Sequence, residues 1–237
     1  MRVRFAKRGR LRFLSHRDVS RSFERALRRA GVPMAFSAGF TPHPRISWVG
    51  AAPTGAASEA EYVELALTAD VEPESLRAAL DAALPAGLDV LDCVPADGAS
   101  LADRIDASRW QVRLPGVDVE TARAAVAELL ARQSVEVERM TKTGPRRIDV
   151  RAAVVCAVCH AAGDACAILD VVVRHTTPAV RPDDVLTALG AVAALSVSAP
   201  AESTRLEQGR LREDGTLADP LAPDRDEAAR PAGRLEA

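Results

Sequence analysis

The order of apolar periodicities along the chain constrains its fold more than any single motif does. Apolar and arginine side chains alternate in residues 2–14, which predicts a half-buried strand, or two strands with a turn at Arg8 and Gly9. Residues 19–30 then place apolar side chains at helical spacing, and Gly31 ends that helix. The segments expected after it are strands at 34–37, 46–52, 61–68 and 88–94, and a helix at 74–84.

A similar order of elements recurs in the second half of the chain. We expect strands at 110–114, 135–140, 149–159, 165–174 and 203–211, and helices at 120–133 and 181–192. Each half approaches the β-α-β-β-α-β order of ferredoxin-like domains with one strand or hairpin added. We therefore predict an α+β protein of two ferredoxin-like halves with mainly antiparallel sheets. The expected parts are a basic half at 1–94, a linker at 95–107, a second half at 108–212 and a disordered acidic tail at 213–237.

Positive charge and aromatic side chains are concentrated at the start of the chain. Residues 1–50 hold twelve Lys/Arg and two acids, a sum of +10, so the −2 of the whole chain leaves −12 for residues 51–237. Seven of the eight aromatic residues occur by Tyr62. Arginine binds phosphate in bidentate geometry and aromatic rings stack on bases. A single Phe is more often a core residue, but the clustering favours a nucleic-acid-binding surface.

The candidate contacts lie on and around the first helix. Four arginines follow one another at steps of four, four and three residues, which places them on one helix face. In the loop at 37–45, glycine and two prolines forbid regular structure, and Phe40 has no periodic reason to be buried. We expect the arginines to contact phosphates and Phe40 to stack on a base. The candidate set is Arg12, His16, Arg17, Arg21, Arg25, Arg28, Phe40, His43 and Arg45.

Two other functions are open at this point. His16 or His43 could supply acid/base chemistry in a metal-independent RNA-processing endonuclease, a class that shares the order of elements only. Each histidine is more often a polar surface residue. The basic face could instead dock on an acidic protein, which would make the chain a protein-interaction module. Ser15, His16 and Asp18 include the residue types of a hydrolase triad, but triad members meet through the fold, so we expect a helix capping box there.

The four cysteines do not predict a metal or haem site. Cys156-Ala-Val-Cys159-His160 matches the haem-attachment string, which requires export, and no apolar signal segment follows the basic N-terminus. A zinc site using Cys166 as well is disfavoured, because a strand sends positions 156 and 159 to opposite faces. The glycine strings of nucleotide cofactor sites are absent, so no cofactor is expected. No segment approaches the ~20 apolar residues of a membrane span, and we expect a cytoplasmic protein with reduced thiols.

Several longer strings carry a resemblance over roughly residues 1–212. They are Phe5-x-Lys7-x-Gly9-x-x-Arg12-Phe-Leu-Ser-His16-x-Asp18, Glu24-Arg-Ala-Leu-Arg-Arg-Ala-Gly-Val-Pro33, Phe36-Ser-x-Gly-Phe-Thr-Pro-His-Pro-Arg45, Ser58-x-x-Glu61-Tyr, Arg147-Ile-Asp149-Val and Arg181-Pro-Asp-Asp-Val-Leu186. Together they resemble the radical-SAM-linked (radical SAM-associated) domain family of uncharacterised bacterial proteins, in its stand-alone form. The resemblance implies a partner, namely a separate radical SAM enzyme, and one that acts on RNA fits the basic surface.

The chain itself lacks the features of that enzyme. The iron–sulfur cluster of radical SAM enzymes needs a CxxxCxxC string, whereas the cysteine spacings here are 63, 3 and 7. We therefore predict a non-catalytic RNA-binding accessory protein that works with a radical SAM enzyme in RNA modification.

Overall fold

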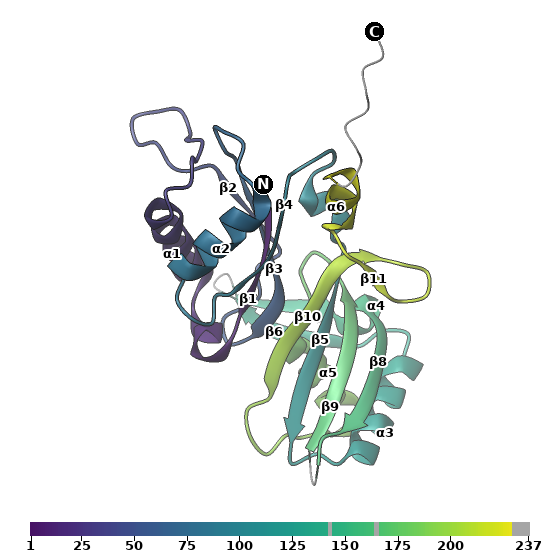
Figure 1. The fold of residues 1–237 in the computed structure, drawn as a ribbon. Helices are drawn as coiled ribbons and strands as arrows, with labels where there is room; N and C mark the ends of the chain where they lie inside the picture. Colours follow the sequence, from purple (N-terminus) through teal and green to yellow (C-terminus); the bar gives the residue numbers. More distant parts are fainter. Residues whose placement is uncertain (142–143, 164–165, 229–237) are drawn as a thin grey trace. The chain divides into compact units, whose positions relative to one another are not determined.

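The computed structural model describes residues 1–141, 144–163 and 166–228, and it divides into two compact units (Figure 1). The first unit contains residues 1–105 and the chain from residue 218 onward, and the second unit contains residues 106–217. The boundary between them differs from the predicted one, because both the predicted linker and the predicted tail contribute to the first unit.

Four strands and two long helices form the first unit. They are β1 (Arg2–Lys7), α1 (His16–Arg29), β2 (Ile46–Val49), β3 (Ala57–Leu65), α2 (Pro73–Ala83) and β4 (Val90–Val94). The strands lie in the order β4-β1-β3-β2 and every neighbouring pair is antiparallel. Both helices contribute to one apolar core with β1, β3 and β4, in which the Phe5 and Phe23 ring centroids are 4.6 Å apart.

The sequence of α1 accounts for its limits and for the face it buries. The Ser15 side chain accepts a hydrogen bond from the Asp18 amide while the Asp18 carboxylate accepts one from the Ser15 amide, so the predicted capping box is present. Phe23 and Leu27 lie on the buried face against the sheet. Gly31 adopts a φ of +65° directly after the helix, a conformation that glycine adopts without strain.

Two segments of the first unit differ from the predicted strands. After β1 the chain forms a 3-10 helix, η1 (Gly9–Phe13), rather than a second strand, because Gly9 turns the backbone at a φ of +55°. Residues 34–37 form isolated bridges only, from Met34 to Leu67 and from Phe36 to Pro44. The first unit therefore has four strands where the sequence predicted five.

The second unit repeats the strand order of the first. Its elements are β5 (Ala107–Pro115), α3 (Val119–Ala131), β6 (Glu136–Thr141), β7 (Gly144–Asp149), α4 (Val150–Ala153), β8 (Val154–Ala161), β9 (Cys166–Arg174), α5 (Pro182–Ala193) and β10 (Glu202–Leu211), and the two-residue strand β11 (Leu217–Ala218) follows. The order β10-β5-β9-β8 is antiparallel throughout, which confirms the prediction of mainly antiparallel sheets.

The predicted strand at 149–159 is wrong in its first part. The Asp149 carboxylate accepts hydrogen bonds from the amides of Val135, at 3.1 Å, and Ala152, at 3.3 Å. The bond from Ala152 caps the short helix α4, so β8 begins only at Val154. The strand before this point, β7, pairs with β6 in a separate two-stranded sheet.

Residues 95–105 of the predicted linker and residues 218–228 of the predicted tail are ordered parts of the first unit. A 3-10 helix, η2 (Leu101–Arg104), and the helix α6 (Ala222–Ala228) surround a small apolar cluster in which Leu101 and Leu221 are fully buried. The Asp224 carboxylate is buried as well and receives the guanidinium of Arg2 at 2.6 Å. A disordered tail from residue 213 is therefore wrong as far as residue 228, because its charges pair with the first unit, and residues 229–237 lie outside the described residues.

Candidate nucleic-acid interface

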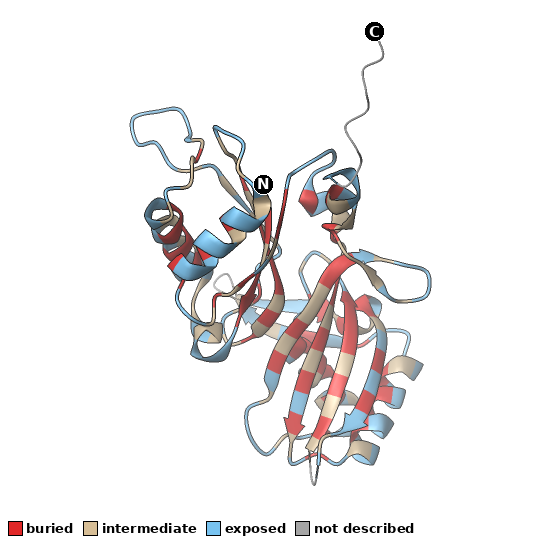
Figure 2. Cartoon of the chain, in the orientation of Figure 1, coloured by how far each residue is buried: buried red, intermediate tan, exposed pale blue. Residues whose placement is uncertain are grey.

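Four arginines of α1 form a continuous exposed row, which we call the arginine ridge: Arg17, Arg21, Arg25 and Arg28. All four are exposed, and Figure 2 shows the outer side of α1 in the colour of exposed residues. In the described part of the chain, none of the four forms an ion pair, and Arg25 only donates to the Ser22 hydroxyl at 3.2 Å. At a rise of about 1.5 Å per residue, the ridge extends about 16 Å along the helix.

Acidic residues on α1 do not neutralise this ridge. The Asp18 carboxylate accepts hydrogen bonds from the Ser15 hydroxyl, at 2.6 Å, and from the Ser15 amide, at 3.2 Å. These bonds lower the pKa of Asp18 more than the nearby arginines do. Glu24 accepts a hydrogen bond from Ser20 on the same helix, at 3.5 Å. The two acids are therefore bonded to hydroxyl and amide groups of α1, and the guanidinium groups remain available to an external anion.

Other basic residues of the N-terminal segment have structural partners. Arg2 is buried against Asp224 and Glu64, and the exposed Arg8 bonds to Glu59 and Asp89. The Lys7 ammonium is buried and donates to carbonyl oxygens after β2, at 3.2 Å for Pro53. Within residues 1–50, Arg2, Lys7 and Arg8 on and next to β1 are thus paired, whereas the four ridge arginines on α1 have no acidic partner in the described chain.

The loop after α1 holds a phenylalanine away from the protein. Two hydrogen bonds between Ser37 and His43 join the two sides of this loop. The Ser37 amide donates to the His43 carbonyl at 2.8 Å, and the His43 amide donates to the Ser37 hydroxyl at 3.0 Å. Phe40 lies at the tip with a relative exposure of 110%, and Phe36 is 58% exposed. An aromatic ring held out in this way loses apolar contact with the core but is open on both faces to a stacking partner.

The structure does not bring the two candidate histidines together. His16 is the first residue of α1, and its ring meets Trp48 edge to face with centroids 5.2 Å apart. His43 belongs to the loop beyond the other end of the same helix. Arg12 lies before α1 and its guanidinium carbon is 4.9 Å from the centroid of the Phe13 ring. If the protein were an endonuclease, only one of these two histidines could therefore act as the acid or base at a given phosphodiester bond.

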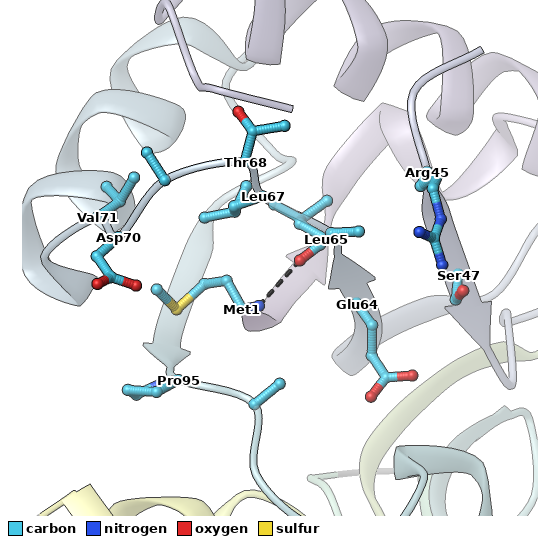
Figure 3. A pocket seen from close by; sticks show the side chains of 13 residues that line it. Met1, Arg45, Ser47, Glu64, Leu65, Leu67, Thr68, Asp70, Val71 and Pro95 are labelled. Atoms are coloured by element: carbon cyan, nitrogen blue, oxygen red, sulfur yellow. Dashed lines mark hydrogen bonds between the residues drawn. The ribbon is translucent and has the colours of Figure 1, made fainter. Parts of the chain in front are cut away.

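Arg45 borders a hollow that sequence reasoning missed. The hollow has a volume of about 740 Å³ and its polar lining includes Arg45, Ser47 and Glu64 (Figure 3). These residues come from β3 and from the start of β2. No spacing in the sequence indicates that they are neighbours, because the pairing register of the two strands brings them together.

The cysteines occupy separate environments. Cys156 is exposed and Cys159 is buried on β8, so the expected placement on opposite faces is confirmed. Burial raises the pKa of the Cys159 thiol to about 11 and that of Cys93 to about 12. Within the described ranges, no group of three or more His, Cys, Asp or Glu side chains is arranged to hold a metal ion. None of the helices described here is long and apolar enough to span a membrane.

Comparison with known families places the chain in one group. A family model described as "Uncharacterized protein conserved in bacteria (DUF2344)" matches residues 1–182 of the 237-residue chain. The protein therefore belongs to this family of uncharacterised bacterial proteins, and the match includes the arginine ridge, the loop with Phe40 and the hollow beside Arg45. No curated protein matches the sequence.

Proposed function

We propose that this protein binds structured RNA through the arginine ridge and the Phe40 loop, as a non-catalytic accessory of a separate radical SAM enzyme. The observation that carries the proposal is the row of four exposed guanidinium groups without acidic partners in the described residues. Some arginines elsewhere pair with acids, as Arg77 does with Glu74 and Arg123 with Glu120, whereas the exposed Arg45 has no acidic partner in the described residues.

The dimensions of the ridge suit a nucleic-acid backbone. A duplex strand carries a phosphate about every 3.4 Å of helix axis, so a ridge of about 16 Å faces several phosphates at once. Guanidinium groups bind phosphate oxygens bidentately. The Phe40 ring beyond the end of the helix supplies a face on which an unpaired base can stack. The roles that we assign are phosphate contact for the ridge and base stacking for Phe40, with Arg12, His16, His43 and Arg45 beside them.

We also propose that both units are ferredoxin-like domains. The support is the strand order, which runs fourth-first-third-second in each unit if β6, β7 and α4 are counted as an insertion. The helices α3 and α5 contact each other, as α1 and α2 do. A shared fold does not establish a shared activity, so the functional argument depends on the surface of the first unit.

The proposed enzyme partner follows from the resemblance of the sequence strings, and RNA modification follows from combining that partner with the basic surface. Isolation of the tagged full-length protein from cells, followed by identification of the bound RNA and protein together, tests this part. Recovery of RNA without a radical SAM protein would remove the partner from the proposal and leave the RNA surface in place.

The RNA surface is tested by reversing charge on the ridge. We expect Arg21→Glu/Arg25→Glu to weaken binding of a structured RNA, measured by fluorescence anisotropy over a range of salt concentrations. Each lost phosphate contact should reduce the slope of log K against log salt by about one. The fold should be unchanged or slightly more stable, because like charges four residues apart cost about 0.2–0.5 kcal/mol per pair in a helix.

The matched control is Arg123→Glu/Arg132→Glu, at Arg123 on α3 and Arg132 directly after it, which changes the net charge by the same amount at exposed arginines. We expect it to retain the RNA affinity of the wild type. Equal loss in both variants would show a general charge effect and contradict the ridge assignment. Cleavage of RNA that disappears with His16→Ala or His43→Ala would favour the endonuclease. Absence of RNA binding together with capture of an acidic protein would favour the interaction module.

A further inference from the structure

The hollow beside Arg45 lies within the first unit, where β2 and β3 line one side of it and residues 67–71, which lead into α2, line another. We propose that it binds a nucleoside 5′-monophosphate unit, either as a free nucleotide or as the phosphorylated end of an RNA. The RNA source rests on the proposed function, whereas the nucleotide chemistry rests on the hollow alone. Its lining combines a cation and a hydroxyl that have no partner in the described chain, a carboxylate and apolar walls, and its volume of about 740 Å³ lies within the range of small-molecule sites.

Arg45 and Ser47 form the end of the hollow that attracts an anion. They lie on the face of β2 opposite Ile46 and Trp48, whose side chains pack against the core. Both Arg45 and Ser47 are exposed, and within the described chain neither side chain makes a hydrogen bond or an ion pair. Figure 3 shows Ser47 on β2 and Arg45 directly before that strand, both at the edge of the hollow. A guanidinium and a hydroxyl two residues apart can both donate to one phosphate group.

Glu64 supplies an acceptor next to this end. It stands opposite Ser47 in the register of β2 and β3, so the two side chains share a face. Arg2 Nε holds the Oε1 atom of Glu64 at 2.9 Å, which fixes the carboxylate. Within the described residues, Glu64 Oε2 has no hydrogen bond and Arg45 lies beyond ion-pair distance from it. A carboxylate in this position can accept hydrogen bonds from the 2′- and 3′-hydroxyls of a ribose, because both hydroxyls are donors.

The remaining walls determine the orientation of the ligand. Met1, Leu67, Val71 and Pro95 contribute apolar surface around the space on the other side of Glu64 (Figure 3). Asp70 is exposed at that side and repels a phosphate. The phosphate is therefore directed to Arg45, the ribose to Glu64 and the base toward the apolar residues.

Calorimetric titration of the full chain with uridine 5′-monophosphate tests the proposal, with uridine and inorganic phosphate as partial ligands. We expect the nucleotide to bind at least tenfold more tightly than either partial ligand. A 2′,3′-dideoxynucleotide should also lose affinity, and this comparison tests Glu64 without altering the protein. Equal binding of inorganic phosphate and nucleotide would indicate a bare anion site and overturn the proposal. Absence of nucleotide binding would overturn it as well.

Protein variants separate this site from the arginine ridge. Arg45→Gln should weaken nucleotide binding at least tenfold with unchanged thermal unfolding, whereas replacement of the half-buried Arg77 outside the hollow, Arg77→Gln, should not weaken it. Arg21→Glu/Arg25→Glu should retain nucleotide binding even where it loses RNA. Nucleotide binding that survives Arg45→Gln would refute the assignment and leave the RNA proposal untouched.

The source of the nucleotide is identified with an RNA oligonucleotide that carries or lacks a 5′-phosphate. If the phosphate strengthens binding at least tenfold in the wild type but not in Arg45→Gln, the ligand is an RNA end. If the phosphate has no effect while uridine 5′-monophosphate binds, the ligand is the free nucleotide. Both results retain the chemistry of the hollow.

Discussion

Asp224 is expected to hold the C-terminal segment on the first unit, and Asp224→Ala tests this role. Its two carboxylate oxygens lie 2.6 and 2.8 Å from Arg2 Nη1, and Oδ2 lies 2.8 Å from Arg104 Nη1. Oδ1 also accepts the Asp97 amide at 3.1 Å. The Arg2 and Asp224 side chains are 3% and 1% exposed, so neither charge can be solvated in place once its partner is removed.

The magnitude follows from this burial. Removal of one partner of a buried ion pair costs about 3–5 kcal/mol, because the remaining charge stays in a low-dielectric environment. For a chain of this length, each 1 kcal/mol shifts the unfolding midpoint by about 2–4 °C, so Asp224→Ala should lower it by about 6–20 °C. Asp224→Asn keeps the shape and one acceptor, and its loss should be smaller. Arg2 retains Glu64 and the Ala99 carbonyl in both variants.

Thermal unfolding followed by circular dichroism measures the effect, with Asp226→Ala as the control. Asp226 lies on the same helix α6 but is exposed, so its replacement should change stability by no more than about 0.5 kcal/mol. Asp224→Ala with the unfolding midpoint of the wild type would refute the reasoning, since it would mean that α6 does not rest on β1 and β4 in solution.

Three further predictions concern pH, backbone and thiols. Burial alone would raise the pKa of Asp224, but hydrogen bonds from Arg2, the Asp97 amide and Arg104 lower it below 3.8. The ionised carboxylate therefore contributes its full stability above pH 3.8, and this contribution is lost as the pH falls through the pKa of the folded state. In an acid titration, the difference in stability between the wild type and Asp224→Asn should disappear only in that acidic range. Gly116→Ala should destabilise more than Gly215→Ala in urea unfolding, because both have φ near +80° but only at residue 116 would a Cβ lie 2.6 Å from the Ser198 Cβ. A thiol reagent should label the exposed Cys156 and the half-buried Cys166 in the native protein and reach Cys93 and Cys159 only on unfolding; rapid native labelling in Cys156→Ser/Cys166→Ser would contradict their burial.

Local signals in the sequence account for the elements that were predicted well. The capping box at Ser15 and Asp18, the apolar face of the helix and Gly31 placed α1 almost to the residue. The prediction failed where an apolar run concealed a break, as at residues 149–159, because α4 is one turn long and its N-cap, Asp149, is also held by a hydrogen bond from the distant Val135 amide. It failed again for α6, where Leu221 is fully buried without any periodic apolar neighbours. The structure of such segments depends on contacts with residues far away in the sequence, and the spacing of apolar residues does not reveal these contacts.

The sequence identified the basic segment but could not show which of its arginines have partners within the protein. Arg4 and Arg21 look alike in composition, yet Arg4 donates to the Glu59 carbonyl at 2.9 Å while Arg21 has no such contact in the described chain. Alternation along β1 and helical spacing along α1 distinguish only the faces of each element. Whether a face meets an acid depends on distant residues, as with Arg2 and Asp224.

The distinction between paired and unpaired arginines also explains where the two proposed ligand sites lie in the first unit. Paired arginines hold the C-terminal segment over the sheet, so that part of the sheet face is already occupied by the chain itself. Arginines without an acidic partner in the described residues include those on the outer face of α1 and Arg45 beside the hollow. An extended phosphate backbone can follow the ridge, whereas a single nucleotide can enter the hollow. The loop that carries Phe40 connects the end of α1 to Arg45 along the chain, which makes it the segment through which an RNA on the ridge could present its end to the hollow.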